Sequence, residues 1–370
     1  MRIVVAFEEP SQRDYLRQLA LSLGLECGPT DCVAYGDLKV RLAREPHDVV
    51  LIVIGSQPVQ AIAVIQQAAA YTKAPLLAAG PSNDSQVILQ SIRAGAREYL
   101  DETHLREELN ASLEKLGQAG LIQHRHGKLI AVTAVLPGTG VTTAATNLAF
   151  AWADRLPRRV ALAEIGAGVP EIGLMLDLEP RHTVADLKGL WDRLDSTMLA
   201  QSLVEHPAGV HVLAHKPETL RVDHLPLEPL QQTLMLLKAM FEVSVLDCGH
   251  NLDAAMGKAL TLCDSVLVVV RLDVPSLRLT RKLLNALTND HAVSRERVQV
   301  VANRYGQRKQ IGLKQAEETL GRPILESIPD DSTTLNEAVN QGMPLIRVAP
   351  RATIARSFLK LANRLEGKPA

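Results

Sequence analysis

The chain has 370 residues, a formal net charge of −1 at pH 7 and only 3% aromatic residues. Its length suits two domains better than one small core. The near-neutral charge, the absence of a long Lys/Arg run and the scarcity of stacking side chains argue against a nucleic-acid-binding protein.

The apolar runs are far shorter than the roughly 20 residues of a membrane span. We therefore expect a cytoplasmic protein whose membrane contact, if any, is peripheral. Four cysteines, Cys27, Cys32, Cys248 and Cys263, form neither a CxxC pair nor a metal-ligand cluster. We expect them to be reduced and mostly buried thiols.

Over residues 1–117, short β-rich runs alternate with helical patterns, which predicts a small doubly wound parallel sheet. The expected strands cover residues 2–6, 48–54, 75–79 and 98–100, and the expected helices cover residues 11–23, 61–71, 85–94 and 105–116. Glycines and polar residues interrupt this pattern at residues 118–128, which we interpret as a linker.

This first region resembles the receiver domain of response regulators, on segments such as Glu8-Glu9-Pro10 and the run from Gly95 to Leu100. The resemblance implies a flavodoxin-like fold with an acidic pair, a phosphate-accepting Asp and a Lys. Those positions hold Phe7-Glu8, Val53 and Glu102. Val53 cannot accept phosphate and Glu102 would repel it. We therefore predict a pseudo-receiver used for docking or self-association. The alternative for Glu8 and Glu9 is that they simply belong to a solvated loop after the first strand.

Residues 129–370 continue the alternation as one large, mostly parallel sheet. A glycine-rich loop, Leu136-Pro137-Gly138-Thr139-Gly140-Val141-Thr142-Thr143, lies between the strand expected at 129–135 and the helix expected at 142–154. Backbone amides at such a strand-to-helix turn bind phosphate. Gly138 and Gly140 allow close approach, and Thr142 is placed to offer its hydroxyl to Mg²⁺. The nucleotide-binding candidates are Gly138, Thr139, Gly140, Val141, Thr142 and Thr143.

The second region, residues 129–366, is similar to MinD/ParA-type P-loop ATPases, whose loop reads KGGxGKTT. Both family lysines are replaced here, by Leu136 and Val141. The resemblance implies that Asp247, which ends the apolar run from Val243, helps to hold Mg²⁺; alternatively, Asp247 only caps the following turn. It also implies that Asn303 reads the adenine edge and that Pro329 lies on the rim of the nucleotide pocket.

A further family position, the acid that orients the attacking water, is occupied by Gly166. Phosphoryl transfer depends on cations and on a positioned nucleophile. We therefore expect no catalytic residues, and weak binding of ATP and Mg²⁺ at most. The loss of one charge-assisted hydrogen bond alone weakens ATP by about 10- to 150-fold. A second interpretation is that the loop binds nothing and only closes the sheet.

A pseudo-receiver followed by a MinD-like domain resembles the layout of the CpaE/TadZ family. The resemblance implies a homodimeric, bacterial localisation and scaffold protein for Flp/Tad type IV pilus assembly or secretion, at the cell pole or the inner-membrane face. The implied partners are the pilus assembly ATPase and inner-membrane pilus or secretion components. The alternative is a slow ParA/MinD-type ATPase that positions cargo through a nucleotide-dependent dimer cycle. We expect the basic amphipathic C-terminal helix to pack on its domain in preference to a membrane.

Overall fold

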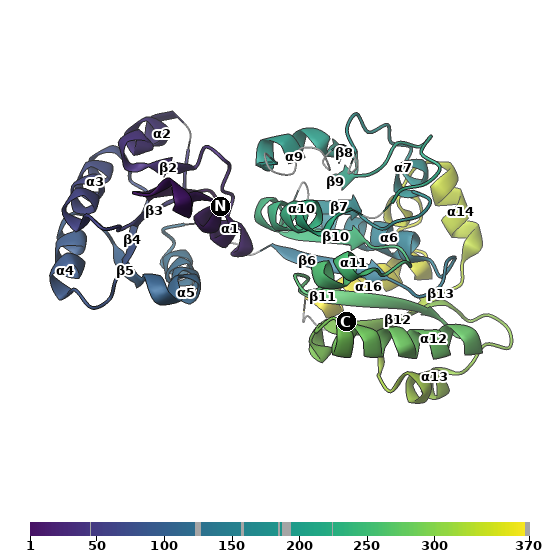
Figure 1. Cartoon of the computed structure of the whole chain (residues 1–370). Coiled ribbons are helices and arrows are strands. Elements are labelled where there is room, and N and C mark those ends of the chain that lie inside the picture. The colour runs from purple at the N-terminus through teal and green to yellow at the C-terminus, as the bar shows by residue number, and fades with distance from the viewer. Residues whose placement is uncertain are drawn as a thin grey trace. The chain divides into compact units, whose positions relative to one another are not determined.

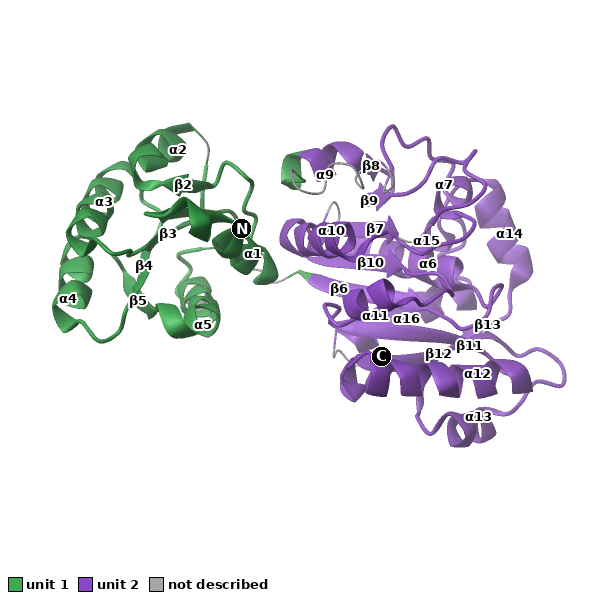
Figure 2. Cartoon of the chain, viewed as in Figure 1, with its two compact units in different colours: residues 1–127, 193–197 green, residues 128–192, 198–370 purple. Residues whose placement is uncertain are grey.

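The computed structural model describes residues 1–44, 46–122, 127–156, 159–183, 186, 194–223 and 225–366. It divides into two compact units, shown in green and purple in Figure 2. The N-terminal unit comprises Met1–Gly127 with Arg193–Thr197, and the C-terminal unit comprises Lys128–Asp192 with Met198–Ala370. Residues 123–126 of the predicted linker lie outside the described residues.

In its described residues, the N-terminal unit contains a five-stranded parallel sheet in the order β2-β1-β3-β4-β5. This is the strand order of flavodoxin-like folds. The strands are β1 (Ile3–Phe7), β2 (Cys32–Ala34), β3 (Val49–Val53), β4 (Leu76–Gly80) and β5 (Glu98–Asp101). The helices are α1 (Arg13–Ser22), α2 (Leu38–Arg44), α3 (Pro58–Tyr71), α4 (Ser85–Arg93) and α5 (Leu105–Gln118).

Both faces of this sheet are covered, because successive residues of a strand point to opposite sides. Ile3 and Val5 of β1 join a core cluster with residues of α1 and α5, whereas Val4 joins a second cluster with residues of α2 and α3. The sequence pattern gave no indication of β2 and α2. These elements are short, three and seven residues, so they carry little periodicity.

In the described part of the C-terminal unit, eight strands form one sheet in the order β13-β12-β11-β6-β10-β7-β9-β8 (Figure 1). Among these strands, only the short edge strand β8 pairs antiparallel. The strands are β6 (Lys128–Thr133), β7 (Val160–Glu164), β8 (Val204–Glu205), β9 (Val210–Leu213), β10 (Val243–Asp247), β11 (Ser265–Arg271), β12 (Val298–Tyr305) and β13 (Ile324–Pro329). The predicted α/β class with two mostly parallel sheets is confirmed.

Helices surround this larger sheet, and the order of its strands places a crevice at the carboxyl end of β6, where ligands bind in open α/β folds. The helices are α6 (Val141–Ala153), α7 (Ile172–Met175), α9 (Ser196–Ser202), α10 (Leu227–Met240), α11 (Ala254–Leu260), α12 (Val274–Asn285), α13 (Leu313–Leu320), α14 (Ser332–Asn340), α15 (Leu345–Val348) and α16 (Thr353–Leu365).

Helix α6 lies at the centre of the C-terminal unit, and eleven of its residues are buried. Its alanines and threonines let it approach β10 and β7 on one side and α16 on the other. Helix α16 buries Ile354, Phe358 and Leu361 against this core, so its apolar face is used inside the unit, as expected from the sequence. Among the described residues, no helix has both the length and the apolar character needed to cross a bilayer.

Candidate functional site

The glycine-rich loop connects β6 to α6 and requires glycine at two positions. Gly138 and Gly140 have φ angles of 69° and 97°, in the left-handed region that favours glycine. A Cβ atom on Gly140 would also lie 2.2 Å from Nδ2 of Asn303. Gly140 is the N-cap of α6, and no side chain caps the helix there. The first amides of α6 are therefore available to an anion, and the helix dipole favours negative charge at the same place.

Two side-chain hydrogen bonds fix the loop. The Thr139 hydroxyl donates to the Leu136 carbonyl oxygen at 2.6 Å, and the Asn303 amide donates to the Thr139 carbonyl oxygen at 2.8 Å. The Asn303 side-chain oxygen in turn accepts from the backbone N–H of Arg304 at 2.9 Å. In this structure Asn303 therefore ties the loop to the end of β12, and the same amide is the group predicted to read adenine.

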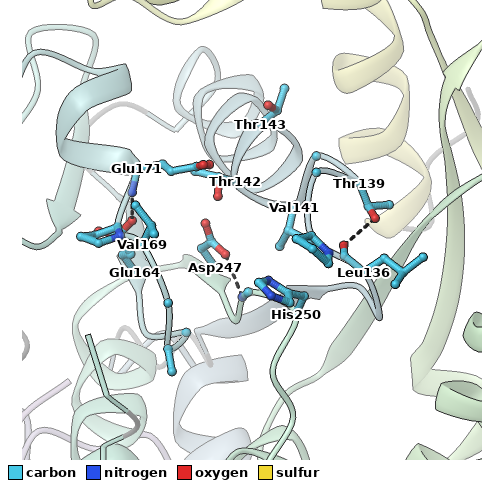
Figure 3. A pocket seen from close by; sticks show the side chains of 18 of the residues that line it. Leu136, Thr139, Val141, Thr142, Thr143, Glu164, Val169, Glu171, Asp247 and His250 are labelled. Atoms are coloured by element: carbon cyan, nitrogen blue, oxygen red, sulfur yellow. Dashed lines mark hydrogen bonds between the residues drawn. The ribbon is translucent and has the colours of Figure 1, made fainter. Parts of the chain in front are cut away.

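An open cavity of about 380 Å³ adjoins the loop. Its lining includes the whole predicted loop, Gly138 to Thr143, together with Asp247. Figure 3 shows the side chains of Thr142 and Asp247 pointing into the same space. Leu136 and Val141 line the cavity without filling it. Pro329, at the end of β13, is not among the residues that line it.

Two buried carboxyl groups end neighbouring strands at this cavity. Burial raises the pKa of Asp247 to about 6, and the charge of Glu171 adds to the rise, while hydrogen bonds from Thr142 and from the Gly249 N–H oppose it. Burial likewise raises the pKa of Glu164 to about 7, although its carboxylate accepts from the backbone N–H groups of Glu171, Ile172 and His215. Both groups consequently titrate near physiological pH.

Glu164 and Glu171 line the cavity as well, although no motif in the sequence marks either as a site residue. The Glu164 carboxylate holds the segment before α7 through its bonds to the N–H groups of Glu171 and Ile172, at 2.6 and 3.0 Å. An acid at the end of an apolar strand was the available signal for Glu164, as it was for Asp247. No periodicity or motif distinguishes Glu171, which the fold brings to the cavity from a loop.

Gly166 has no room for a side chain. A Cβ atom there would lie 2.5 Å from the carbonyl carbon of Cys248 and 2.6 Å from the nitrogen of Gly249. Both atoms belong to the backbone, which cannot move aside as a flexible side chain can. The position is thus shaped for glycine, and an acid could not stand there without a shift of the loop after β10.

Acidic side chains outnumber basic ones in the described lining of the cavity. Glu164, Glu171 and Asp247 face it, and among the described lining residues Arg304 is the one Lys or Arg side chain. Phosphates bound here would be held chiefly by backbone amides, with help from the exposed cation of Arg304.

The donor set also suits magnesium, though only in part. Thr142 and Asp247 offer the hydroxyl and carboxylate oxygens that Mg²⁺ prefers. Within the described residues, no group of three or more His, Cys, Asp or Glu side chains could hold a metal by itself. Mg²⁺ usually takes its remaining ligands from water and substrate phosphates. Thr142 and Asp247 therefore fit a magnesium ion that arrives with a nucleotide.

The receiver-like positions of the N-terminal unit are occupied by other contacts. Val53 ends β3 and is buried, and its carbonyl oxygen accepts a hydrogen bond from the Tyr35 hydroxyl. Burial raises the pKa of Tyr35 to about 12, so this hydroxyl keeps its proton. The Glu8 carboxylate accepts from the Ser56 hydroxyl at 3.1 Å and from the Gln57 N–H at 3.2 Å. Glu8 thus stabilises the turn that leads into α3.

Comparison with known proteins agrees with the fold of the C-terminal unit. The family model described as "CobQ/CobB/MinD/ParA nucleotide binding domain" matches residues 130–345. The septum site-determining protein MinD of Synechocystis is 23% identical over 248 residues, which are 65% of this chain and 90% of that protein.

Two solved structures share this fold. A ParA family ATPase from Chlorobium tepidum has a TM-score of 0.58 and 21% identity, covering 64% of this chain and 98% of that one. The MinD protein of Pyrococcus horikoshii, solved with Mg-ADP, has a TM-score of 0.55 and 21% identity, covering 65% and 96%.

Proposed function

Because the chain belongs to the CobQ/CobB/MinD/ParA nucleotide-binding family, we propose that it is a CpaE/TadZ-type localisation and scaffold protein that binds nucleotide weakly and does not turn it over. Its partners are the pilus assembly ATPase and the inner-membrane components of a Flp/Tad pilus or secretion machinery. It acts as a homodimer in the bacterial cytoplasm, at the pole or the inner-membrane face. The observation that carries the proposal is the open cavity at the glycine-rich loop. Thr142 and Asp247, which suit Mg²⁺, line it, whereas Leu136, Val141 and Gly166 stand where the family has two lysines and an acid.

Weak nucleotide binding is supported by the loop itself. The uncapped amides at the start of α6 and the pair Thr142 and Asp247 remain in place around the cavity. Val141 offers no charge where the family lysine stands, and a charge-assisted hydrogen bond contributes about 1.5–3 kcal/mol. Arg304 replaces only part of that contribution, since its side chain is exposed and water screens it.

The absence of turnover is supported by three separate changes. Val141 and Leu136 remove the charges that would stabilise the transition state, and Gly166 removes the group that would orient water. The backbone around Gly166 leaves no space for that group. A single reversion therefore cannot restore the whole mechanism.

The scaffold role is supported by the N-terminal unit as well. Its receiver-type fold retains neither the phosphate acceptor nor the lysine, because Val53 and Glu102 occupy those positions. Tyr35 and Ser56 now bond to the groups that remain there. A receiver-type domain that cannot accept phosphate still offers the surface of its fold, which suits docking or self-association.

One observation favours the slow ATPase as a second candidate. Thr142 bonds to Asp247 and both face an open cavity, and a MinD relative was solved with Mg-ADP. A nucleotide-dependent dimer cycle would need these two residues in every round.

Chromosomal replacement by Thr142→Ala, with a gene deletion beside it, separates the two candidates in cells. We expect the deletion to abolish Flp-type pili and Thr142→Ala to leave pilus number and the polar focus of a fluorescent fusion close to wild type. Loss of pili in Thr142→Ala at normal protein level would favour the ATPase cycle. Unchanged pili in the deletion strain would refute the pilus role.

A further inference from the structure

A second cavity, of about 440 Å³, lies at the carboxyl ends of β11 and β12. Residues 271–275, 303–304 and 307–311 line it, and we call it the basic recess. It uses the end of β11, the first residues of α12 and the loop after β12. Two of its residues also belong to the nucleotide site: Asn303, which the resemblance assigns to the adenine edge, and Arg304, which lines both cavities. Arg308 and Lys309 line the recess and not the nucleotide cavity.

The basic recess carries an unbalanced positive charge. Arg271, Arg304, Arg308 and Lys309 line it, against the single carboxylate of Asp273. Asp273 is already engaged, since it pairs with Arg271 at 3.4 Å and caps α12 through the Ser276 N–H at 2.9 Å. Within the described part of the chain, the other three cations have no acidic partner. Their mutual repulsion is relieved by an anion.

The loop that presents these cations is held in place before any ligand arrives. The Gln310 side-chain oxygen accepts from the N–H groups of Gly306 and Gln307 at 3.0 and 3.1 Å. The Gln307 amide donates to Asp330 at 2.9 Å, and the Ile311 N–H donates to the Leu272 carbonyl at 2.9 Å. The loop backbone is thus tied to the residue after β11 and to the segment after β13, which fixes the backbone from which Arg308 and Lys309 extend.

Backbone strain at the end of β12 and in the loop after it falls on basic residues. Arg304 and Lys309 have φ angles of 55° and 61°, which side chains other than glycine rarely adopt. Such strain persists where surrounding structure enforces it, and it is frequent at ligand sites. Here both strained residues are basic and both line the recess.

We propose that the basic recess is a docking site for a carboxylate-rich segment of a partner protein. Guanidinium groups pair with carboxylates through two parallel hydrogen bonds, and exposed Val274 offers an apolar edge beside them. The described lining contains no aromatic side chain on which a base could stack, which favours an acidic peptide over a nucleic acid. Arg308 and Lys309 do not line the nucleotide cavity, so the proposal does not depend on whether the chain binds nucleotide.

Fluorescence anisotropy on the full chain tests the proposal with labelled oligoglutamate, oligoglutamine of the same length and a short DNA duplex. We expect oligoglutamate to bind at low ionic strength and oligoglutamine not to bind. The double variant Arg308→Glu with Lys309→Asp should bind oligoglutamate at least about tenfold more weakly. Aspartate at this second position tolerates the left-handed backbone, and an unchanged melting temperature confirms folding.

The matched control is Lys216→Glu with Lys258→Glu, which changes the net charge equally at exposed lysines outside the recess. We expect it to bind oligoglutamate within about twofold of wild type. Equal losses in both double variants would show a general charge effect and overturn the proposal. If wild type does not bind oligoglutamate, the proposal is also wrong. It is wrong as well if wild type binds the DNA duplex more tightly than oligoglutamate and only the recess variant loses DNA binding, because the recess would then be a nucleic-acid site.

Discussion

Replacing Asp247 by asparagine should remove a large part of the pH dependence of stability. Burial raises the Asp247 pKa from 3.8 to about 6, so the folded chain retains a proton that the unfolded chain releases between these values. The stability that Asp247 contributes is complete below about pH 4 and is lost as the pH rises to about 6. This rise of about two pH units corresponds to about 3 kcal/mol.

The asparagine side chain would carry no charge and would still accept a hydrogen bond from the Gly249 N–H. We therefore expect the Asp247→Asn variant to unfold like wild type near pH 4 and to be more stable than wild type at pH 7.5, by about 1–3 kcal/mol. The lower end allows for a weaker bond to Thr142. Glu164 adds a similar slope up to about pH 7, and because the Asp247 charge helps to raise the Glu164 pKa, the substitution should also lower that pKa and reduce this slope.

Urea unfolding followed by tryptophan fluorescence measures this difference, because Trp152 is buried in the core of the C-terminal unit. Mg²⁺ provides a second readout: at pH 7.5 it should stabilise wild type more than the variant, since it neutralises the carboxylate that the variant lacks. Parallel pH profiles for the two proteins, or a variant that is less stable at pH 7.5, would show that burial does not raise the Asp247 pKa as stated.

Three further substitutions test separate parts of the account. Gly166→Asp places its Cβ against the Cys248 carbonyl carbon, so it should lower the free energy of unfolding by about 1–3 kcal/mol and give no ATP turnover. A variant that is both stable and active would contradict this. Asn303→Ala removes the hydrogen bond to the Thr139 carbonyl oxygen, so it should lower the free energy of unfolding by about 1–2 kcal/mol and weaken nucleotide binding. Unchanged binding in a nucleotide-titration assay would show that this hydrogen bond is not needed for binding. Val53→Asp should stay unlabelled by acetyl phosphate, because Glu102 stands where the family has lysine. It should also melt at a lower temperature, because the side chain at this position is buried and a buried carboxylate is costly; phosphate incorporation would contradict the pseudo-receiver.

Much of the fold could be predicted from local patterns. The buried strands ending at Asp247 and Arg271 are nearly continuous apolar runs, interrupted in the first by Ser244, which is how parallel strands covered on both faces appear in a sequence. The glycine-rich loop was recognisable because its glycines are demanded by backbone conformation, a requirement that sequence displays directly. The short β2 gave no such signal, since three residues cannot establish a period.

The chemistry of the site was harder to predict. Asn303 was assigned to adenine by resemblance, yet its amide bonds to Thr139 in this structure. The raised pKa of Glu164 depends on burial and on neighbours from three segments, and none of these is visible along the chain. Gly166 looked like a missing acid, and the structure adds that the Cys248 backbone excludes one. Sequence shows which residue stands at a position, whereas tertiary contacts decide what can replace it.

The most direct measurement is ATP binding and turnover by the purified full chain with Mg²⁺, compared with Val141→Lys and Thr142→Ala. We predict weak binding and no turnover by wild type. Val141→Lys should bind ATP at least about tenfold more tightly, still without turnover, because Gly166 remains. Robust turnover by wild type that disappears in Thr142→Ala would contradict the central claim.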